Sequence, residues 1–249
     1  MSRAFWALAQ GESDAPATLR IDGSIVADDD AWYYDWANES YVCPAGFRRA
    51  LEGVGDLVVA INSPGGDVVA ASCIYTALRE HAARGHQVQV RIEGMAASAA
   101  SVIAMAGTSV AIAPTAYIMI HDPWSTVSGN PDELRDCAAM LDSIAEGIVS
   151  AYQLRTGMSR AHIRELMRAE TWMDARRAVR LGFADTVLYA EGESEPEGEP
   201  APASDRAGWT LRAVASLRAH APASQPVNPR ADALLREQLR LLADDDMED

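Results

Sequence analysis

The order of the sequence patterns, in which strand-like and helix-like segments alternate, constrains the fold of this chain more than any other feature. Alternating apolar residues predict strands, and stretches with helical periodicity lie between them. Such an order is typical of βαβ units, in which helices cover a parallel sheet, so we expect an α/β protein. The strands are predicted near residues 18–26, 57–62, 87–92 and 116–120, and the helices near 44–52, 67–84, 97–107 and 131–155.

Three motifs of small or polar residues lie beside these predicted strands. Residues 61–68 place two glycines between a strand and a helix, which allows close backbone approach and leaves N–H groups free where the helix starts. Residues 94–101 surround Ser98 with small side chains, and residues 119–124 place His121 after an apolar segment. A hydroxyl, an imidazole and a turn with accessible N–H groups are what a serine nucleophile needs for acyl transfer.

The charged residues restrict both the chemistry and the partners of the chain. All 21 basic residues are arginine, and without lysine the chain cannot build a Ser–Lys dyad or form a Schiff base. A catalytic base must therefore be His, Asp or Glu. The formal net charge of -15 argues against binding to nucleic acid or to an anionic membrane, because both partners would be repelled.

Cysteine and histidine usage indicates neither a disulfide framework nor a metal site. Three widely spaced cysteines without a CxxC pair predict reduced thiols and a cytoplasmic location, and no segment resembles a signal peptide or a membrane span. No histidine–carboxylate cluster has metal-ligand spacing, so we expect no metal ion and no cofactor. The histidines other than His121 are predicted on solvated faces or at helix caps: His81, His86, His162 and His220.

Taken in this order, the motifs resemble the Clp protease proteolytic subunit family, and in particular the phage head maturation (prohead) proteases with a Clp-like fold. The resemblance covers roughly residues 16–190 and implies an α/β spiral of the ClpP/crotonase type, assembled as homo-oligomeric rings with inward-facing active sites. The chain has no Walker A motif, so an ATP-dependent unfoldase would be a separate partner. The matching segments are INSPGGDV at 61–68, GMAASAAS at 94–101, MIHDPW at 119–124 and ETWMDARRAVRLGFAD at 170–185, and the phage character rests on Phe5-Trp6, MIHDPW and ETW.

The resemblance also implies roles for individual residues. Ser98 matches the family's nucleophile and His121 matches its general base. The backbone N–H groups of Gly66 and Ala99 fall where the family builds its oxyanion hole. Glu170 falls at the position of the family's third catalytic residue, which is usually an aspartate.

Glu170 departs from the family pattern, so the identity of the third residue stays open. A glutamate can accept a hydrogen bond from the imidazole and hold its tautomer, but its extra methylene requires a different backbone distance. Asp122 is a poorer alternative, because neighbouring side chains of a strand point to opposite faces. Asp174 is better explained as a helix cap, as is Ser159, and Gly182 fits the end of the last short helix.

The long predicted helix begins with strong capping signals. Asn130 can cap it, Pro131 suits its first position and Glu133 completes a capping box. In relatives this helix projects as a handle through which two rings meet, and its apolar positions suit either a core within the chain or a seam between subunits. The expected domains are a protease domain at 1–190, an acidic Pro/Gly-rich linker at 191–207 and a weakly helical acidic tail at 208–249.

These patterns predict a serine endopeptidase that cleaves capsid or scaffold proteins during phage head maturation, by a Ser-His-acid mechanism inside an oligomeric chamber. Two alternatives belong to other classes. A crotonase-like enzyme would use paired backbone N–H groups to hold an acyl-CoA enolate, without needing Ser98 and His121. A catalytically weak scaffold or capsid-assembly protein would use its acidic tail to bind coat protein.

Overall fold

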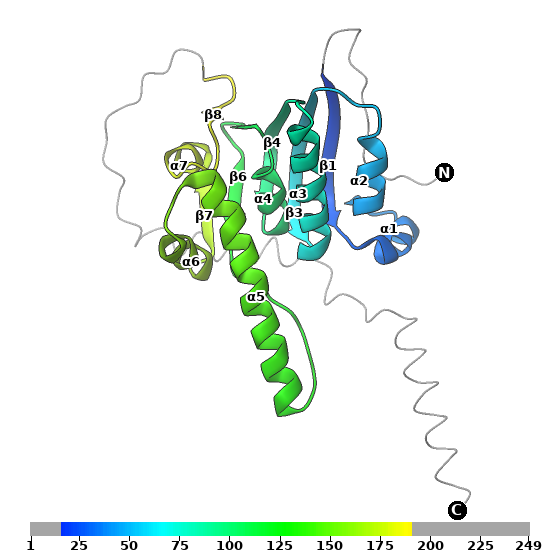
Figure 1. Cartoon of the computed structure of the whole chain (residues 1–249), viewed down its shortest axis with the longest axis vertical. Coiled ribbons are helices and arrows are strands. Elements are labelled where there is room, and N and C mark those ends of the chain that lie inside the picture. The colour runs from blue at the N-terminus through cyan, green and yellow to red at the C-terminus, as the bar shows by residue number, and fades with distance from the viewer. Residues whose placement is uncertain (1–15, 191–249) are drawn as a thin grey trace, which may run out of the picture. The chain divides into compact units, whose positions relative to one another are not determined.

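The computed structural model describes residues 16–190 of the chain (Figure 1). None of the helices in this part combines the length and the hydropathy of a membrane span. Several predictions fall outside the described residues, and these concern the linker 191–207, the tail 208–249, the Phe5-Trp6 opening and His220.

One sheet organises residues 16–190. Its strands are β1 (Ala17–Ile25), β2 (Tyr41–Val42), β3 (Leu57–Gly66), β4 (Val88–Ala97), β5 (Ser109–Ile112), β6 (Tyr117–Ile120), β7 (Thr171–Asp174) and β8 (Thr186–Val187). They are joined in the order β2-β1-β3-β4-β5-β8, and β6 enters the same sheet by pairing with β4 and with β7. Every pair is parallel except β6 and β7, which run antiparallel. The predicted α/β fold with a parallel sheet is therefore confirmed.

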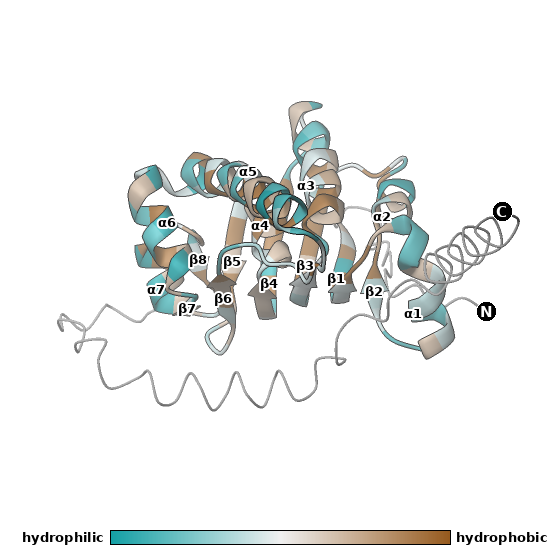
Figure 2. Ribbon diagram, turned by 90° about the horizontal axis from the view of Figure 1, so that it is seen from below, coloured by the Kyte–Doolittle hydropathy of each residue, from teal (hydrophilic) through white to brown (hydrophobic). Residues whose placement is uncertain are grey.

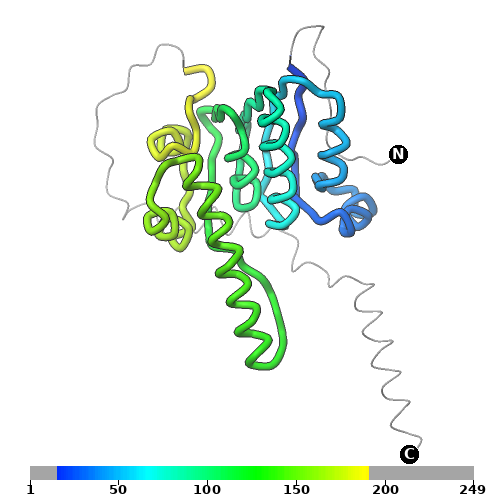
Figure 3. The backbone as a smooth tube through the Cα atoms, in the orientation of Figure 1, coloured from blue at the N-terminus to red at the C-terminus, as the bar shows by residue number. Residues whose placement is uncertain are grey.

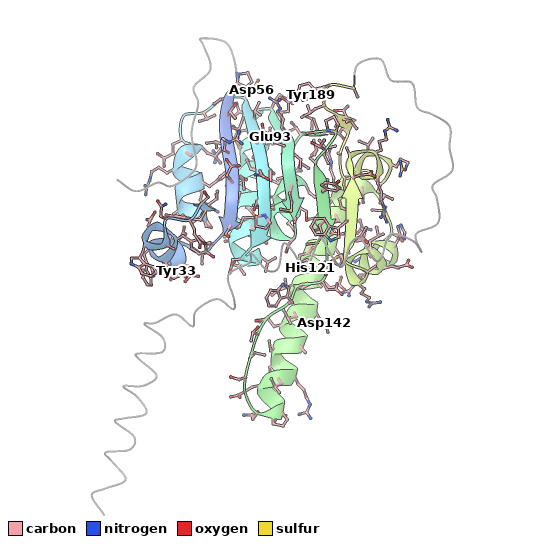
Figure 4. The ribbon with its side chains drawn as sticks, turned by 180° about the vertical axis from the view of Figure 1, so that it is seen from behind. Tyr33, Asp56, Glu93, His121, Asp142 and Tyr189 are labelled. Atoms are coloured by element: carbon pink, nitrogen blue, oxygen red, sulfur yellow. The ribbon has the colours of Figure 1, made fainter. Side chains whose placement is uncertain are left out.

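The helices of this part of the chain are the 3-10 helix η1 (Asp28–Asp30), α1 (Ala31–Ala37), α2 (Pro44–Ala50), α3 (Val68–Ala83), α4 (Ala99–Ala104), α5 (Pro131–Thr156), α6 (Arg160–Arg168) and α7 (Ala175–Arg180). Four of them cover one face of the sheet. Figures 1 and 2 show α2, α3, α4 and α5 on the same side of the strands. The opposite face, toward the viewer in Figure 4, presents the strands themselves.

The alternation of residues along the strands explains why the helices pack on one face. In β1, Leu19 and Ile21 are fully buried, whereas Arg20 between them is partly exposed. Because successive side chains point to opposite faces, Arg20 reaches Asp22 at 2.7 Å and Glu93 at 2.8 Å on the other side of the sheet. Burying one large aliphatic side chain stabilises a fold by about 1.5–3 kcal/mol, so the apolar side of β1 faces the helices.

Strand β4 pairs with two different strands along one edge. Residues 89–92 pair with β5, and residues 95–97 pair with β6. The carboxyl ends of β4 and β6 therefore lie side by side, and the next residues include Ser98 on one chain segment and His121 on the other. Parallel sheets commonly form their binding sites at the carboxyl ends of their strands. The pairing thus brings together two motifs that are separate in the sequence.

Two strands are longer than the sequence patterns predict. β3 continues to Gly66 because Gly65 and Gly66 pair with the end of β1, and β4 continues to Ala97 because residues 95–97 pair with β6. Glycine and alanine are depleted in strands, so these continuations carry no recognisable strand pattern. As a consequence, α4 is shorter than the helix predicted near 97–107. The antiparallel strand β7 was not predicted at all.

The prediction that His81 lies on a solvated face is wrong. Its side chain is 3% exposed, and its Nε2 lies 2.7 Å from the carbonyl oxygen of Gly55. Its ring also stacks on His86, with the ring centroids 4.6 Å apart. A buried polar group needs such a partner, because an unsatisfied one destabilises the fold. His162 is exposed, as predicted, and its backbone N–H donates to the Ser159 hydroxyl that caps α6.

Helix α5 projects from the rest of the fold (Figures 1 and 3). It has 26 residues, which corresponds to about 39 Å at the usual rise per residue. Asn130 caps it as predicted, because its side chain accepts the N–H groups of Asp132 and Glu133 while the Glu133 carboxylate accepts the N–H of Asn130. Its buried residues begin only at Ala145, so the first half of the helix extends beyond the packed core.

Candidate active site

Ser98 lies where β4 ends and α4 begins. Its N–H donates to the carbonyl oxygen of Met119 at 2.9 Å, which extends the pairing of β4 with β6 by one residue. The chain then turns sharply, and this turn gives Ser98 a φ of 53° and a ψ of -125°. Such a conformation costs a non-glycine residue about 1–3 kcal/mol and tends to occur at functional sites. The backbone geometry therefore singles out Ser98 independently of its motif.

The side chains of Ser98 and His121 are in direct contact. Ser98 Oγ lies 2.7 Å from His121 Nε2, the usual length of a hydrogen bond that involves a hydroxyl. Both residues are half-buried, so the pair is held by the protein and still reachable from solvent. Figure 4 labels His121 where the sheet meets the projecting helix. An imidazole in this position can accept the hydroxyl proton when the oxygen attacks an electrophile.

Strand β7 brings Glu170 to the same place. In the antiparallel ladder of β6 and β7, Ile120 pairs with Thr171, and His121 and Glu170 are the residues that adjoin this last pair. Glu170 also has a positive φ, 46°, so its backbone is strained as that of Ser98 is. The structure thus places all three predicted side chains at one end of the sheet.

The other carboxylates considered in the sequence are placed differently. Asp174 accepts the N–H of Arg177 at 2.8 Å and caps α7, as predicted. It pairs with Tyr117 at the far end of the ladder from His121. Gly182, with a φ of 77°, follows the end of α7, also as predicted.

Across residues 16–190, no group of three or more His, Cys, Asp or Glu side chains is arranged to hold a metal ion.

Two glycines at the end of β3 pack closely against neighbouring backbone, Gly65 against the turn at Ser98 and Gly66 against Ile25 of β1. A Cβ on Gly65 would lie 2.8 Å from the Cβ of Ser98 and 2.9 Å from the nitrogen of Ala99. A Cβ on Gly66 would lie 2.1 Å from the carbonyl oxygen of Ile25. Their φ angles, 98° and 146°, also disfavour any side chain. Only glycine therefore lets β3 come this close to Ser98.

The predicted oxyanion-hole donors, the N–H groups of Gly66 and Ala99, belong to these two adjoining segments. Ala99 is the first residue of α4, so its N–H has no acceptor within the helix. The buried Ser63 holds the β3 segment, because its hydroxyl donates to the carbonyl of Gly23 at 2.7 Å and accepts the N–H of Gly65 at 3.1 Å. Two such donors beside a hydroxyl can stabilise the negative charge of a carbonyl oxygen that the hydroxyl attacks.

Two hydroxyl groups behind Ser98 were not singled out from the sequence. Ser101 donates to the carbonyl oxygen of Ser98 at 2.5 Å, and its Oγ lies 2.7 Å from the hydroxyl oxygen of Tyr152. Tyr152 fits the apolar pattern of the long helix, so the sequence assigns it only a packing role. The available signal is weak, since it consists of a second serine three residues after Ser98.

Sequence comparison assigns residues 50–191, more than half of the chain, to the family described as Clp protease. The chain belongs to the Clp protease family. It is 31% identical over 139 residues to the ATP-dependent Clp protease proteolytic subunit 1 of Chlamydia muridarum, an alignment that covers 54% of this chain and 70% of the relative. It is 32% identical over 144 residues to the ATP-dependent Clp protease proteolytic subunit of Ligilactobacillus salivarius, covering 57% of this chain and 72% of the relative.

Membership of the Clp protease family makes the chain a peptidase, and hence a hydrolase, with a ClpP-like fold. The matched region begins at Ala50, the last residue of α2, and includes β3, β4, α4, β6, α5 and β7. It contains Ser98, His121, Glu170 and the two predicted oxyanion-hole residues, so the local geometry and the family assignment concern the same part of the chain.

Proposed function

We propose that this Clp-family peptidase is a serine endopeptidase in which Ser98 is the nucleophile, His121 the general base and Glu170 the residue that orients the imidazole. The observation that carries the proposal is the 2.7 Å hydrogen bond between Ser98 Oγ and His121 Nε2. A serine hydroxyl is a weak nucleophile until an adjacent base takes its proton. Glu170 fixes the tautomer by accepting a hydrogen bond from the other ring nitrogen.

The geometry supports the following sequence of steps. Ser98 Oγ attacks the carbonyl carbon of the scissile peptide bond while its proton moves to Nε2 of His121. The N–H groups of Gly66 and Ala99 stabilise the oxyanion of the tetrahedral intermediate. The C–N bond then breaks, and the imidazolium donates its proton to the leaving amine. Water attacks the acyl-enzyme with the same base, which releases the new carboxyl group and restores Ser98.

We further propose that the peptidase works in homo-oligomeric rings in the cytoplasm and that its natural substrates are capsid or scaffold proteins during phage head maturation. The projecting first half of α5 supports assembly, since within residues 16–190 it contains no buried residue. The relatives are proteolytic subunits of ATP-dependent proteases, which supports an ATP-dependent unfoldase as the partner that delivers substrate. The MIHDPW and ETW segments support the phage role.

A fluorophosphonate probe tests whether the chain contains one activated serine. The purified, assembled protein is expected to gain a single adduct in its intact mass, located at Ser98 by peptide mapping, because the probe reacts with activated hydroxyls. Ser98→Ala is expected to gain none, whereas Ser143→Ala, which removes an exposed serine of α5, is expected to label like the parent. An assembled parent without an adduct would overturn the proposal and favour a scaffold role.

The parent protein and Ser98→Ala also test the proposed substrate class. The parent is expected to cut purified phage coat or scaffold protein into discrete fragments detected by mass spectrometry, and Ser98→Ala is expected to leave it intact. A parent that labels at Ser98 but cleaves only unfolded model proteins would keep the peptidase assignment and remove the role in head maturation.

Glu170→Gln is expected to lower kcat by about 10²–10⁴-fold, because an amide can favour the wrong imidazole tautomer. Glu170→Asp keeps the carboxylate and is expected to remain more active than Glu170→Gln. The measurement is the initial rate of hydrolysis of a fluorescently labelled unfolded protein. Asp122→Asn, which removes the carboxylate next to His121 in the sequence, is the control and is expected to match the parent. A Glu170→Gln variant with parental kcat would leave Ser98 and His121 as a dyad.

A further inference from the structure

Two hydroxyl groups, those of Ser101 in α4 and Tyr152 in α5, link helix α5 to the carbonyl group of Ser98. Ser101 Oγ lies 2.5 Å from that carbonyl oxygen and 2.7 Å from the hydroxyl oxygen of Tyr152. Ser101 is fully buried and Tyr152 is 1% exposed. Neither group can therefore exchange its protein partner for bulk water.

The direction of these hydrogen bonds follows from the number of protons. A serine hydroxyl has one proton to donate, and a carbonyl oxygen can only accept. Ser101 therefore donates to Ser98, and Tyr152 must donate to Ser101. Burial raises the pKa of the Tyr152 hydroxyl well above its ordinary value, so the phenol stays protonated, and remains a donor, at neutral and moderately alkaline pH.

The same carbonyl receives a second hydrogen bond, from the backbone N–H of Ser101 at 2.9 Å. With two donors on its oxygen, the peptide group between Ser98 and Ala99 is held in one orientation. A trans peptide is planar, and residues 16–190 contain no cis peptide bond. The N–H of Ala99 consequently points away from the anchored carbonyl, and its nitrogen lies against Gly65, where the oxyanion hole is proposed.

This peptide group needs an anchor because its neighbour is strained. Ser98 combines a φ of 53° with a ψ of -125°, which is an unfavourable pair for a residue with a side chain. A rotation of this peptide group toward a more favourable ψ would turn the Ala99 N–H away from the site. The hydrogen bond from Tyr152 polarises the Ser101 hydroxyl and strengthens its bond to the carbonyl. The Tyr152 ring is itself fixed by edge contact with Phe183, with the ring centroids 5.4 Å apart.

We propose that Ser101 and Tyr152 are positioning residues that hold the Ala99 N–H in the oxyanion hole. The inference rests on the proposed function, since an oxyanion hole matters only if Ser98 is the nucleophile. Neither side chain touches the substrate, and both act through the peptide group that follows Ser98. The projecting helix is thereby connected to the catalytic turn by a chain of two hydroxyl groups.

Tyr152→Phe and Ser101→Ala test this role, because each removes a single hydroxyl. Each is expected to lower kcat about 10-fold with KM unchanged, since the oxyanion forms only in the transition state. Fluorophosphonate labelling is expected to slow by a similar factor and still reach one adduct per chain. A merely structural role would do the opposite, because it would lower the final extent of labelling and leave the rate per labelled site unchanged.

A double variant and a matched control sharpen the test. Ser101→Ala combined with Tyr152→Phe is expected to be no slower than Ser101→Ala alone, because both hydroxyls act through the same bond. Tyr75→Phe makes the same chemical change at a partly buried tyrosine of α3, and it is expected to match the parent.

The possible outcomes separate this inference from the proposed function. Parental kcat and parental labelling rates in Tyr152→Phe and Ser101→Ala would overturn the positioning role and leave Ser98 as the nucleophile. A parent that does not label would overturn the proposed function instead. Because rates are expressed per labelled site, a variant that folds only in part still gives a decisive value.

Discussion

Ser98→Ala and His121→Ala are each expected to lower kcat for peptide cleavage by about a million-fold, as in a hydroxyl–imidazole pair that acts as one unit. The two side chains share the 2.7 Å hydrogen bond, so the loss of either removes the attacking oxygen or its base. The double variant is therefore expected to be no slower than either single variant. The rate that remains comes from substrate binding and the N–H groups of Gly66 and Ala99. Hydrolysis of a labelled unfolded protein by equal amounts of assembled protein measures all three.

Ser143→Ala and His162→Ala are the controls for these variants. Both residues are exposed and lie outside the site, so these changes delete the same chemical groups without touching Ser98 or His121. Their kcat values are expected to match the parent. Losses that simply add in the Ser98/His121 double variant would contradict a concerted mechanism, because additive effects indicate residues that act independently.

Gly65→Ala is expected to lower kcat/KM about 100-fold, the typical effect of displacing a catalytic group by about 1 Å. The new Cβ would lie 2.9 Å from the Ala99 nitrogen and 2.8 Å from the Ser98 Cβ, and both of these atoms belong to the turn at Ser98. Neither neighbour is the flexible end of a long side chain, so the turn or β3 must move. Kinetics and thermal unfolding of the same preparations would measure the loss of activity and the loss of stability separately.

Gly85→Ala is the matched control for this change. Gly85 has a φ of 97°, close to the 98° of Gly65, but a Cβ there meets nothing within 4 Å. It therefore carries the same backbone strain without the contact, and it is expected to cost about 1–2 kcal/mol of stability and no activity. If Gly65→Ala keeps parental kcat/KM, close packing of β3 against Ser98 is not needed for catalysis.

The sequence predicts β1, β3, β4 and β6 and the helices between them because their patterns depend on local burial. Leu19 and Ile21 alternate with polar residues, and α3 and α5 show helical periodicity with capping residues at their starts. The rest depends on contacts between distant segments. β7 is a strand because it pairs with β6. The end of β3 is extended because it pairs with β1, and the end of β4 is extended because it pairs with β6.

In the candidate site, too, local motifs are predictable from the sequence and contacts between distant segments are not. Ser98, His121 and the two glycines stand in recognisable motifs, so the sequence singles them out. Whether Glu170 could lie opposite His121 depends on the register of β7, which no local pattern shows. The bond between Ser101 and Tyr152 joins residues 51 positions apart, and it exists only because α4 packs near α5. Periodicity alone cannot distinguish a buried tyrosine used for packing from one whose hydroxyl is aimed at a partner.

Helix α5 is anchored at one end only, and this has a consequence for a subunit on its own. Its first turns, which precede Ala145, contain no fully buried residue within residues 16–190, and Ile144 at their end packs partly against the core. These turns are held by their capping box and by intrahelical bonds. An isolated helix of this length is marginal in water, so in a free subunit these turns are expected to fray and re-form. A surface that covers them would shift that equilibrium by mass action. If subunits associate through this surface, as proposed, the degree of order in this segment rises with protein concentration and reports on association.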